Sequence, residues 1–286
     1  MDEPKTPNAN TMSLPSSDES LWAVRSTINP YLHGINFMVR RLKWDLKFES
    51  WRSRHLLQRS KNIHQREKAV IVCNGPSLNR TDLTQLAGVY CIGMNKINLL
   101  FERSNFRPQC IVAINDLVIE QNRDFFNSTV TDLYLAHESL PIIRPRNNVT
   151  FLYTEPSYRL AKDCSISVCP GATVTTVALQ LAFHLGFLDV ALVGCDHNFV
   201  AKGEANKTVT AGSKDDSHFD PRYFSGGVKW QLPDLVASEF YYELARRMFL
   251  SEGRRVVNST VDGKLEIFER MSLDEWLNNK LPAPGS

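Results

Sequence analysis

The chain has 286 residues, of which 43% are apolar and 22% are charged, close to the average of globular proteins. This composition is enough for one large or two small domains with a full core. It excludes collagen, a coiled coil and a wholly disordered chain. The longest apolar runs fall far short of the roughly 20 residues that cross a bilayer, so we expect no transmembrane helix.

The N-terminal segment, residues 1–20, is polar, acidic and rich in Pro, Ser and Asn, which predicts a disordered tail. It has neither the basic start nor the apolar stretch of a secretory signal. The six cysteines show no Cys-x-x-Cys spacing, so we expect reduced thiols. These features predict a cytoplasmic protein.

Residues 21–67 are predicted to form a separate basic, amphipathic helical region. Residues 25–68 contain eleven Lys and Arg against three acidic residues, a net charge of +8, so the rest of the chain carries −6. Aromatic and aliphatic residues are interleaved with these cations. One interpretation is a helical collar packed on the main domain, and another is peripheral attachment to the anionic inner face of a membrane. Nucleic-acid binding is disfavoured, because no recognised module accompanies the charge.

From residue 68 onward, short β-branched runs alternate with helical segments. The expected strands are 69–73, 89–94, 109–114, 132–136, 149–153, 190–193 and 255–258. The expected helices are 78–86, 117–126, 172–185, 235–251 and 273–278. This alternation predicts an α/β fold, a Rossmann-like and mostly parallel sheet with helices on both faces. We assign residues 68–286 to this domain, with a long lid loop at about 197–232.

Polar side chains follow four of the expected strands. Asn74, Asn95, Asn115 with Asp116, and Asp196 each come directly after an apolar run. In sheets of this kind, ligands bind beyond the carboxyl ends of the strands. A single Asn after a strand is usually only a turn residue, but four polar positions at one edge favour a binding site.

The turn Asn74-Gly75-Pro76-Ser77 is the first candidate for binding phosphate. Gly75 allows the backbone to turn tightly, and Pro76 suits the first position of a helix. The free N–H groups at a helix start attract anions. The turn is not a Walker A loop, and the chain lacks the Gly-x-Gly-x-x-Gly motif, so ordinary NTPase and NAD-binding functions are disfavoured.

A second turn before a helix contains Gly171, Ala172 and Thr173. Its N–H groups and hydroxyl could contact an anion, although an ordinary helix N-cap explains the same residues equally well. The expected lid keeps several aromatic residues and His218, which by residue type is the best general base. A surface histidine without a role remains an alternative.

The sequence neither establishes nor excludes a metal site. Carboxylates at Asp116, Asp196, Asp215 and Asp216 could hold a Mg²⁺ that bridges a diphosphate. The sequence has no His-Glu-x-x-His, Asp-x-Asp or EF-hand pattern. No metal or cofactor is therefore predicted with certainty.

Two parts of the sequence carry a resemblance to known families. The first comprises VIVCNGPSL at 70–78, GMN at 93–95 and IND at 114–116, and the second is PGATVTTVALQLAFHLGFLDVALVGCDHNF at 170–199. Together they resemble the MptE-like family, named for an archaeal 6-hydroxymethylpterin diphosphokinase. The pattern also looks like the sialyltransferases of glycosyltransferase family 42 and the related motility-associated flagellin glycosyltransferases. The resemblance covers about residues 68–260.

The resemblance implies roles for individual residues. In the sialyltransferases, the first turn and the second strand end bind a CMP-sugar, and lid residues act as the base and as phosphate contacts. The implied donor-binding residues are Asn74, Gly75, Pro76, Ser77, Asn95, Asn115, Asp116, Gly171, Ala172 and Thr173. The implied catalytic residues are His218, Tyr223 and Asp196. The spacing of the lid residues and the HNF at 197–199 depart from the sialyltransferase pattern.

The implied function is a glycosyltransferase that moves a sugar, such as a nonulosonic acid, from a CMP-sugar to a surface-glycan or lipid-linked acceptor. The alternative enzyme is a 6-hydroxymethylpterin diphosphokinase-like transferase, which would need Mg²⁺ at Asp116 and Asp196. A third alternative is a non-catalytic nucleotide-binding protein of a polysaccharide pathway. The expected partners are the donor, the acceptor and a membrane surface through residues 25–68, with no nucleic acid. The sequence leaves a homo-oligomer open.

Overall fold

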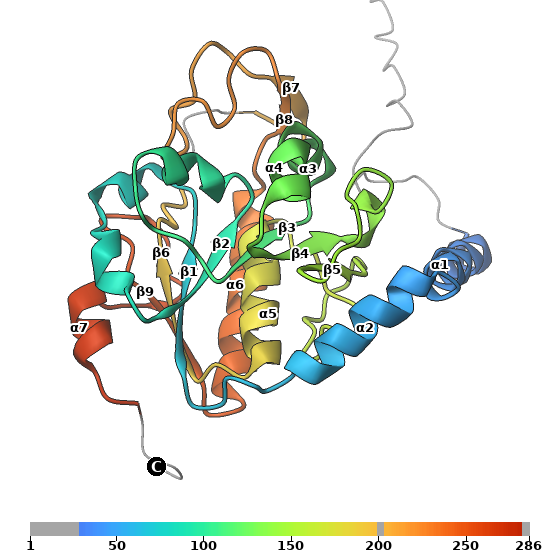
Figure 1. Cartoon of the computed structure of the whole chain (residues 1–286), viewed down its shortest axis with the longest axis horizontal. Coiled ribbons are helices and arrows are strands. Elements are labelled where there is room, and N and C mark those ends of the chain that lie inside the picture. Colours follow the sequence, from blue (N-terminus) through green and yellow to red (C-terminus); the bar gives the residue numbers. More distant parts are fainter. Residues whose placement is uncertain (1–28, 199–202, 282–286) are drawn as a thin grey trace, which may run out of the picture.

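The computed structural model describes residues 29–198 and 203–281. The predicted tail at 1–20 lies outside these residues. The described chain forms an eight-stranded sheet in the order β10-β9-β6-β1-β2-β3-β4-β5, and all seven neighbouring pairs are parallel. Helices and loops cover both faces (Figure 1). The predicted α/β, Rossmann-like fold is confirmed.

The strands of the large sheet are short, and all except β10 are mostly buried. They are β1 (Lys68–Val72), β2 (Tyr90–Met94), β3 (Cys110–Ala113), β4 (Asp132–Ala136), β5 (Val149–Leu152), β6 (Asp189–Val193), β9 (Arg255–Asn258) and β10 (Glu269–Arg270). Seven of them match the expected strands within one or two residues. The two-residue strand β10 is an addition, as is the separate antiparallel hairpin of β7 (Thr208–Thr210) and β8 (Lys229–Gln231).

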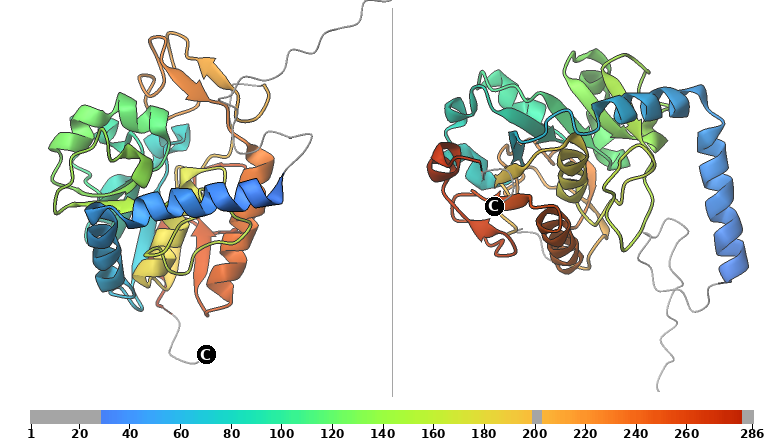
Figure 2. Two further views of the ribbon diagram at one scale, coloured as in Figure 1. Left: turned by 90° about the vertical axis from the view of Figure 1, so that its right-hand side faces the viewer. Right: turned by 90° about the horizontal axis from the view of Figure 1, so that it is seen from below.

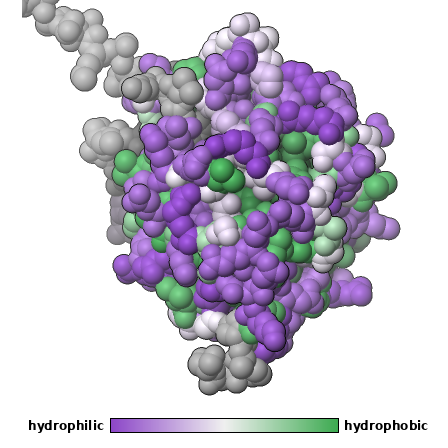
Figure 3. Space-filling model, turned by 90° about the vertical axis from the view of Figure 1, so that its left-hand side faces the viewer, coloured by the Kyte–Doolittle hydropathy of each residue, from purple (hydrophilic) through white to green (hydrophobic). Residues whose placement is uncertain are grey.

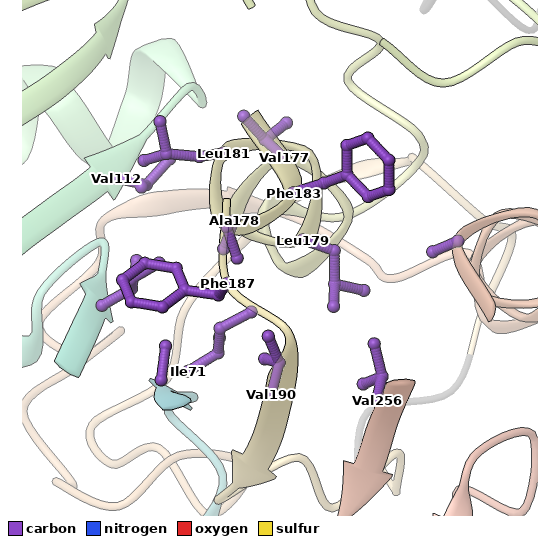
Figure 4. Packing of buried hydrophobic residues seen from close by; sticks show 14 of the residues in the cluster. Ile71, Val112, Val177, Ala178, Leu179, Leu181, Phe183, Phe187, Val190 and Val256 are labelled. Atoms are coloured by element: carbon purple, nitrogen blue, oxygen red, sulfur yellow. The ribbon is translucent and has the colours of Figure 1, made fainter. Parts of the chain in front are cut away.

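One face of the sheet is covered by α5 (Val174–Leu185), α6 (Leu235–Leu250) and the end of α2 (Phe48–Ser60). Figure 4 shows α5 packed over Ile71, Val190 and Val256 of three neighbouring strands. α5 is buried on nearly all sides and is mostly apolar, except for a row of Thr176, Gln180 and His184, whose polar atoms are hydrogen-bonded to backbone groups. Thr173 caps its start, and Gly186, with φ of +104°, ends it in the left-handed conformation.

The other face is covered by short elements. They are the 3₁₀ helices η1 (Pro76–Arg80), η2 (Leu83–Leu86), η3 (Ile97–Glu102) and η4 (His137–Ser139), and the helices α3 (Asp116–Gln121), α4 (Arg123–Ser128) and α7 (Leu273–Asn278). Two expected helices are therefore divided. The helix expected at 78–86 is broken where Asp82 caps η2, and the helix expected at 117–126 is interrupted at Asn122.

The predicted basic region forms two helices, α1 (Pro30–Asp45) and α2. The two meet at a bend, and α1 is the outermost element of the molecule (Figure 2). α2 packs along β5 at the edge of the sheet. Within the described part of the chain, no helix is long and apolar enough to cross a membrane.

Candidate active site

A cavity of about 570 Å³ opens at the carboxyl ends of β1, β2, β3 and β6. β1 lies between β2 and β6, so the cavity is at the point where the chain changes direction across the sheet, the usual ligand site of this fold. It is closed from the other side by residues of the 203–232 segment and the start of α6. The predicted site residues that line it are Asn74, Gly75, Asn95, Asn115, Asp116, Ala172, Thr173, Asp196, His218 and Tyr223. Pro76, Ser77 and Gly171 do not line it.

Two asparagines at the strand ends present unsatisfied acceptors. The Nδ2 of Asn74 donates to the Met94 carbonyl at 3.1 Å, which ties the first strand end to the second. The Oδ1 atoms of Asn74 and Asn95 are both buried and have no hydrogen-bond partner among the described residues. A buried acceptor without a donor costs about 1–3 kcal/mol. Both residues line the cavity, so a ligand that offers O–H or N–H donors would remove this cost.

The first predicted phosphate site is already filled by the protein itself. The Asp196 carboxylate accepts from the Ser77 N–H at 3.2 Å and from the Ser77 Oγ at 2.6 Å. Ser77 is buried, and a Cβ on Gly75 would overlap the same carboxylate. The absence of a side chain at Gly75 therefore makes room for Asp196, whereas the sequence suggested room for a ligand. Asp196, expected to be catalytic, caps this turn.

The second predicted turn faces the cavity instead. Ala172 and Thr173, with the first residues of α5, line the cavity. Gly171 and Ala172 both have positive φ, +54° and +60°, and this reversal starts α5 two residues later than expected. The N-terminus of a 12-residue helix thus points its N–H groups and its partial positive charge toward the cavity. This turn is the better place for an anionic group of a ligand.

His218 is hydrogen-bonded to an acidic residue for which the sequence suggested only metal binding. The Nδ1 of His218 lies 2.7 Å from the Oδ2 of Asp215, and both side chains are nearly buried. Burial tends to raise the pKa of the Asp215 carboxyl, but the hydrogen bond and charge of His218, together with two backbone N–H donors, lower it. The N–H groups of Ser217 and Phe224 also donate to this carboxylate. The sequence feature that could have indicated this pair is that Asp215 lies three residues before His218.

Tyr223 fixes the other side of the imidazole. Its ring stacks on that of His218 with 4.0 Å between centroids and 2° between planes. The phenol is buried, and burial raises its pKa far above the usual value. Tyr223 therefore holds the ring of His218 in a fixed orientation. This position differs from the expected role as a phosphate contact, although Tyr223 also lines the cavity.

The segment that carries His218 is bound firmly to the sheet. The Phe219 N–H donates to the Asn74 carbonyl at 2.9 Å, and the Phe219 side chain is buried. The Nζ of Lys96 donates to the Tyr223 carbonyl and to Oε1 of Gln121, each at 2.7 Å. Burial lowers the pKa of Lys96 to about 8. This part of the expected lid is thus packed against the sheet. The start of that loop, at 199–202, lies outside the described residues.

The charge of the cavity limits its ligands. Its lining, counted over the described residues, contains Asp116, Asp196, His197 and His218 but no Lys or Arg. Burial, followed by the nearby charge of Glu138, raises the pKa of Asp116. An anionic group of a ligand can be stabilised here by helix N-terminal N–H groups and by histidine. Such a cavity is better suited to a ligand with one phosphate than to a triphosphate.

The residues do not fit a preformed magnesium site. Within 29–198 and 203–281, no group of three or more His, Cys, Asp or Glu side chains is placed to hold a metal. Of the two predicted ligands, Asp196 uses its carboxylate to hold Ser77. Asp215, a further candidate, is bound to His218.

The family model of 6-hydroxymethylpterin diphosphokinase MptE-like proteins matches residues 46–202. This match spans more than half of the chain. The chain belongs to the MptE-like family. The match includes β1 to β6, and therefore every strand whose carboxyl end borders the cavity. The membership expected from the two sequence runs is confirmed.

Two further comparisons gave one similar solved structure and no curated relative. Among solved structures, a MAf glycosyltransferase from Magnetospirillum magneticum AMB-1 is similar, with 15% identity and a TM-score of 0.47. The alignment covers 82% of this chain and 40% of that one, so the chain spans about two fifths of its length. No curated protein sequence matches the chain.

Proposed function

We propose that this MptE-like protein is a glycosyltransferase that uses a CMP-sugar donor and a surface-glycan or lipid-linked acceptor. The observation that carries the proposal is the nearly buried Asp215–His218 pair at a cavity without cationic side chains among its described residues. A CMP-sugar carries one phosphate between the nucleoside and the sugar. A nucleoside triphosphate carries several times more charge, which a cavity lined by two aspartates would bind poorly.

In the proposed reaction, His218 accepts the proton of the acceptor hydroxyl as its oxygen attacks the anomeric carbon of the donor. Asp215 holds Nδ1 of the ring and stabilises the imidazolium that forms. The bond between the anomeric carbon and the phosphate oxygen breaks, and CMP leaves with the electron pair. The N-terminus of α5 stabilises the departing phosphate. The Oδ1 atoms of Asn74 and Asn95 accept from the nucleoside.

Ligand binding is the first test. Thermal unfolding of the full chain is measured with CMP, CDP, UDP, GDP and ATP, each with and without Mg²⁺. CMP at 100 times its Kd should stabilise the fold by about 2.7 kcal/mol without metal. Asn74→Ala should abolish this shift, because it removes the amide that joins the two strand ends. A shift with ATP only in the presence of Mg²⁺ would refute the proposal.

Turnover is the second test. With CMP-sugars as donors, release of CMP should fall by about 10²–10⁴-fold in His218→Ala and at least about tenfold in Asp215→Asn, while CMP binding persists. The matched controls are His55→Ala in α2 and Asp216→Asn, both at exposed positions outside the cavity lining. Undiminished turnover in His218→Ala would refute its role as the base.

The diphosphokinase is the second candidate, because the matching family model is named for that activity. It would transfer a diphosphate from ATP to a pterin alcohol. The cavity lining argues against it on charge, since the protein would have to bind a triphosphate beside Asp116 and Asp196. Formation of a pterin diphosphate from ATP by the purified protein would decide in its favour.

A further inference from the structure

Helix α1 exposes a continuous apolar stripe. Seven apolar side chains of this helix are each between 43% and 81% exposed. With a rotation of about 100° per residue around the helix axis, all seven lie within an arc of roughly 120°. We call this set the α1 stripe: Tyr31, Leu32, Ile35, Met38, Val39, Leu42 and Leu46. Phe48 and Trp51 at the start of α2 are also exposed, at 81% and 68%. The exposed apolar region therefore extends over both helices.

The opposite side of α1 fixes the helix on the protein. Trp44 is buried and packs edge-on against His137, with 5.1 Å between ring centroids. The Arg41 guanidinium donates to the Ile166 carbonyl at 2.6 Å and to Asp45 at 2.8 Å. These contacts hold the C-terminal half of α1 with the α1 stripe turned away from the body.

This region differs from the rest of the surface. Of the nineteen large apolar side chains that are exposed in the described chain, ten lie between Tyr31 and Trp51. The other nine are scattered between Ile63 and Val261. The side of the molecule that faces away from α1 is mostly hydrophilic, with isolated apolar residues (Figure 3). Isolated apolar residues are normal on a surface, whereas a contiguous patch marks an interaction site.

The charge around the stripe identifies the partner. Residues 29–68 contain ten Lys and Arg against three acidic residues. Asp45 and Glu49 are already paired with arginines of the same two helices. Lys43 and Lys47 are exposed beside the stripe and form no ion pair with any described residue. The partner must therefore be anionic as well as able to take apolar side chains.

A second copy of the chain meets only one of these two requirements. A two-fold interface through α1 would bring the same basic region of both copies together, and like charges would oppose it. A phosphate backbone alone would leave the aliphatic stripe in water. The boundary between the headgroups and the acyl chains of an anionic bilayer satisfies both the apolar side chains and the cations.

We propose that α1 and the start of α2 bind the surface of an anionic membrane. The α1 stripe enters the interfacial layer, and Lys43 and Lys47 remain at the level of the lipid phosphates. At 16 residues, α1 lies in the plane of the surface and does not cross it. The proposal is independent of the proposed transferase activity, because none of its residues lines the cavity.

The test is flotation of the full chain with vesicles of phosphatidylcholine alone or mixed with phosphatidylglycerol. The protein should float with the anionic vesicles only, and salt near 1 M, where the Debye length is about 3 Å, should release most of it. Ile35→Glu with Leu42→Glu should lower the bound fraction at least about tenfold. The matched control is Val130→Glu, an exposed apolar residue outside α1 and α2, and this variant should bind like the natural chain. Equal thermal unfolding of all variants confirms that they fold.

Four outcomes would overturn the proposal. They are the absence of vesicle binding, equal binding of the stripe variant and the control, equal binding to both vesicle types, and a dimer in light scattering that the stripe variant converts to a monomer. Trp51 supplies an independent readout. Its fluorescence should shift to shorter wavelength with anionic vesicles, and Trp51→Phe should remove most of that shift. No shift would also contradict insertion.

Discussion

Replacing Gly75 by Ala should destabilise the protein, although its backbone is suitable for alanine. Its φ of −71° and ψ of 162° are ordinary for any residue. The new Cβ would overlap Oδ2 of Asp196, and it would lie 2.6 Å from Cγ of Asp196 and 2.7 Å from the Gly194 carbonyl. The strands β1 and β6 run side by side here, so the backbone cannot easily yield. The Asp196 carboxylate must move.

The cost follows from what Asp196 holds. Its carboxylate accepts from the N–H and Oγ of Ser77, which is buried. Hydrogen bonds to a charged group contribute about 1.5–3 kcal/mol each, and overpacking adds about 1–3 kcal/mol. Since some bonds can re-form after a shift, we expect a loss of about 3 kcal/mol. In a domain of this size, that lowers Tm by roughly 6–12 °C.

Thermal unfolding of Gly75→Ala measures this loss, with Gly212→Ala as the control. A Cβ on Gly212 meets nothing within 4 Å, so its Tm should change by about 1 °C at most. In an Asp196→Ala background, Gly75→Ala should cost far less, because the main clash is gone. An unchanged Tm in Gly75→Ala would refute the steric argument. Equal costs in both backgrounds would place the clash on Gly194 instead.

Two further predictions concern buried charges. Lys96 has a folded pKa of about 8 against 10.5 for an exposed lysine, so the unfolded chain holds this proton more tightly. The stability of the natural chain relative to Lys96→Met should therefore rise by up to about 3 kcal/mol between pH 8 and 10.5, as measured by urea unfolding, and a flat difference would contradict this. Asp189 is fully buried and accepts from Arg255 and from the Trp276 indole, each at 2.8 Å. Asp189→Ala should lower the free energy of unfolding by about 3–5 kcal/mol, whereas removing the exposed Asp262, which pairs with Arg80, should cost less than about 1 kcal/mol.

The local signals of the sequence were sufficient for most elements of the sheet. β-branched runs bounded by turn residues predicted seven of its eight strands, and the polar residues that follow four of them do reach one cavity. α7 was predicted at its observed bounds because Ser272 caps it and because the pattern that identifies a short helix lies within the helix itself. The strand β10 has only two residues and no such pattern, since its pairing with β9 alone defines it.

The sequence determined which residues meet at the carboxyl edge of the sheet, because parallel strands bring their ends together whatever the details of packing. The tertiary structure decided what those residues do. Asp196 and Ser77 are 119 residues apart in the sequence. Only the side-by-side packing of β6 and β1 shows that the Asp196 carboxylate occupies the turn at Ser77, where the sequence suggested a bound phosphate. His218 was recognisable as a candidate base, but its partner Asp215 was not distinguished from neighbouring aspartates, because the direction of a loop side chain depends on the sheet beneath it. The periodicity of α1 was likewise visible in the sequence. That its apolar side faces solvent was not, because burial depends on every other element of the fold.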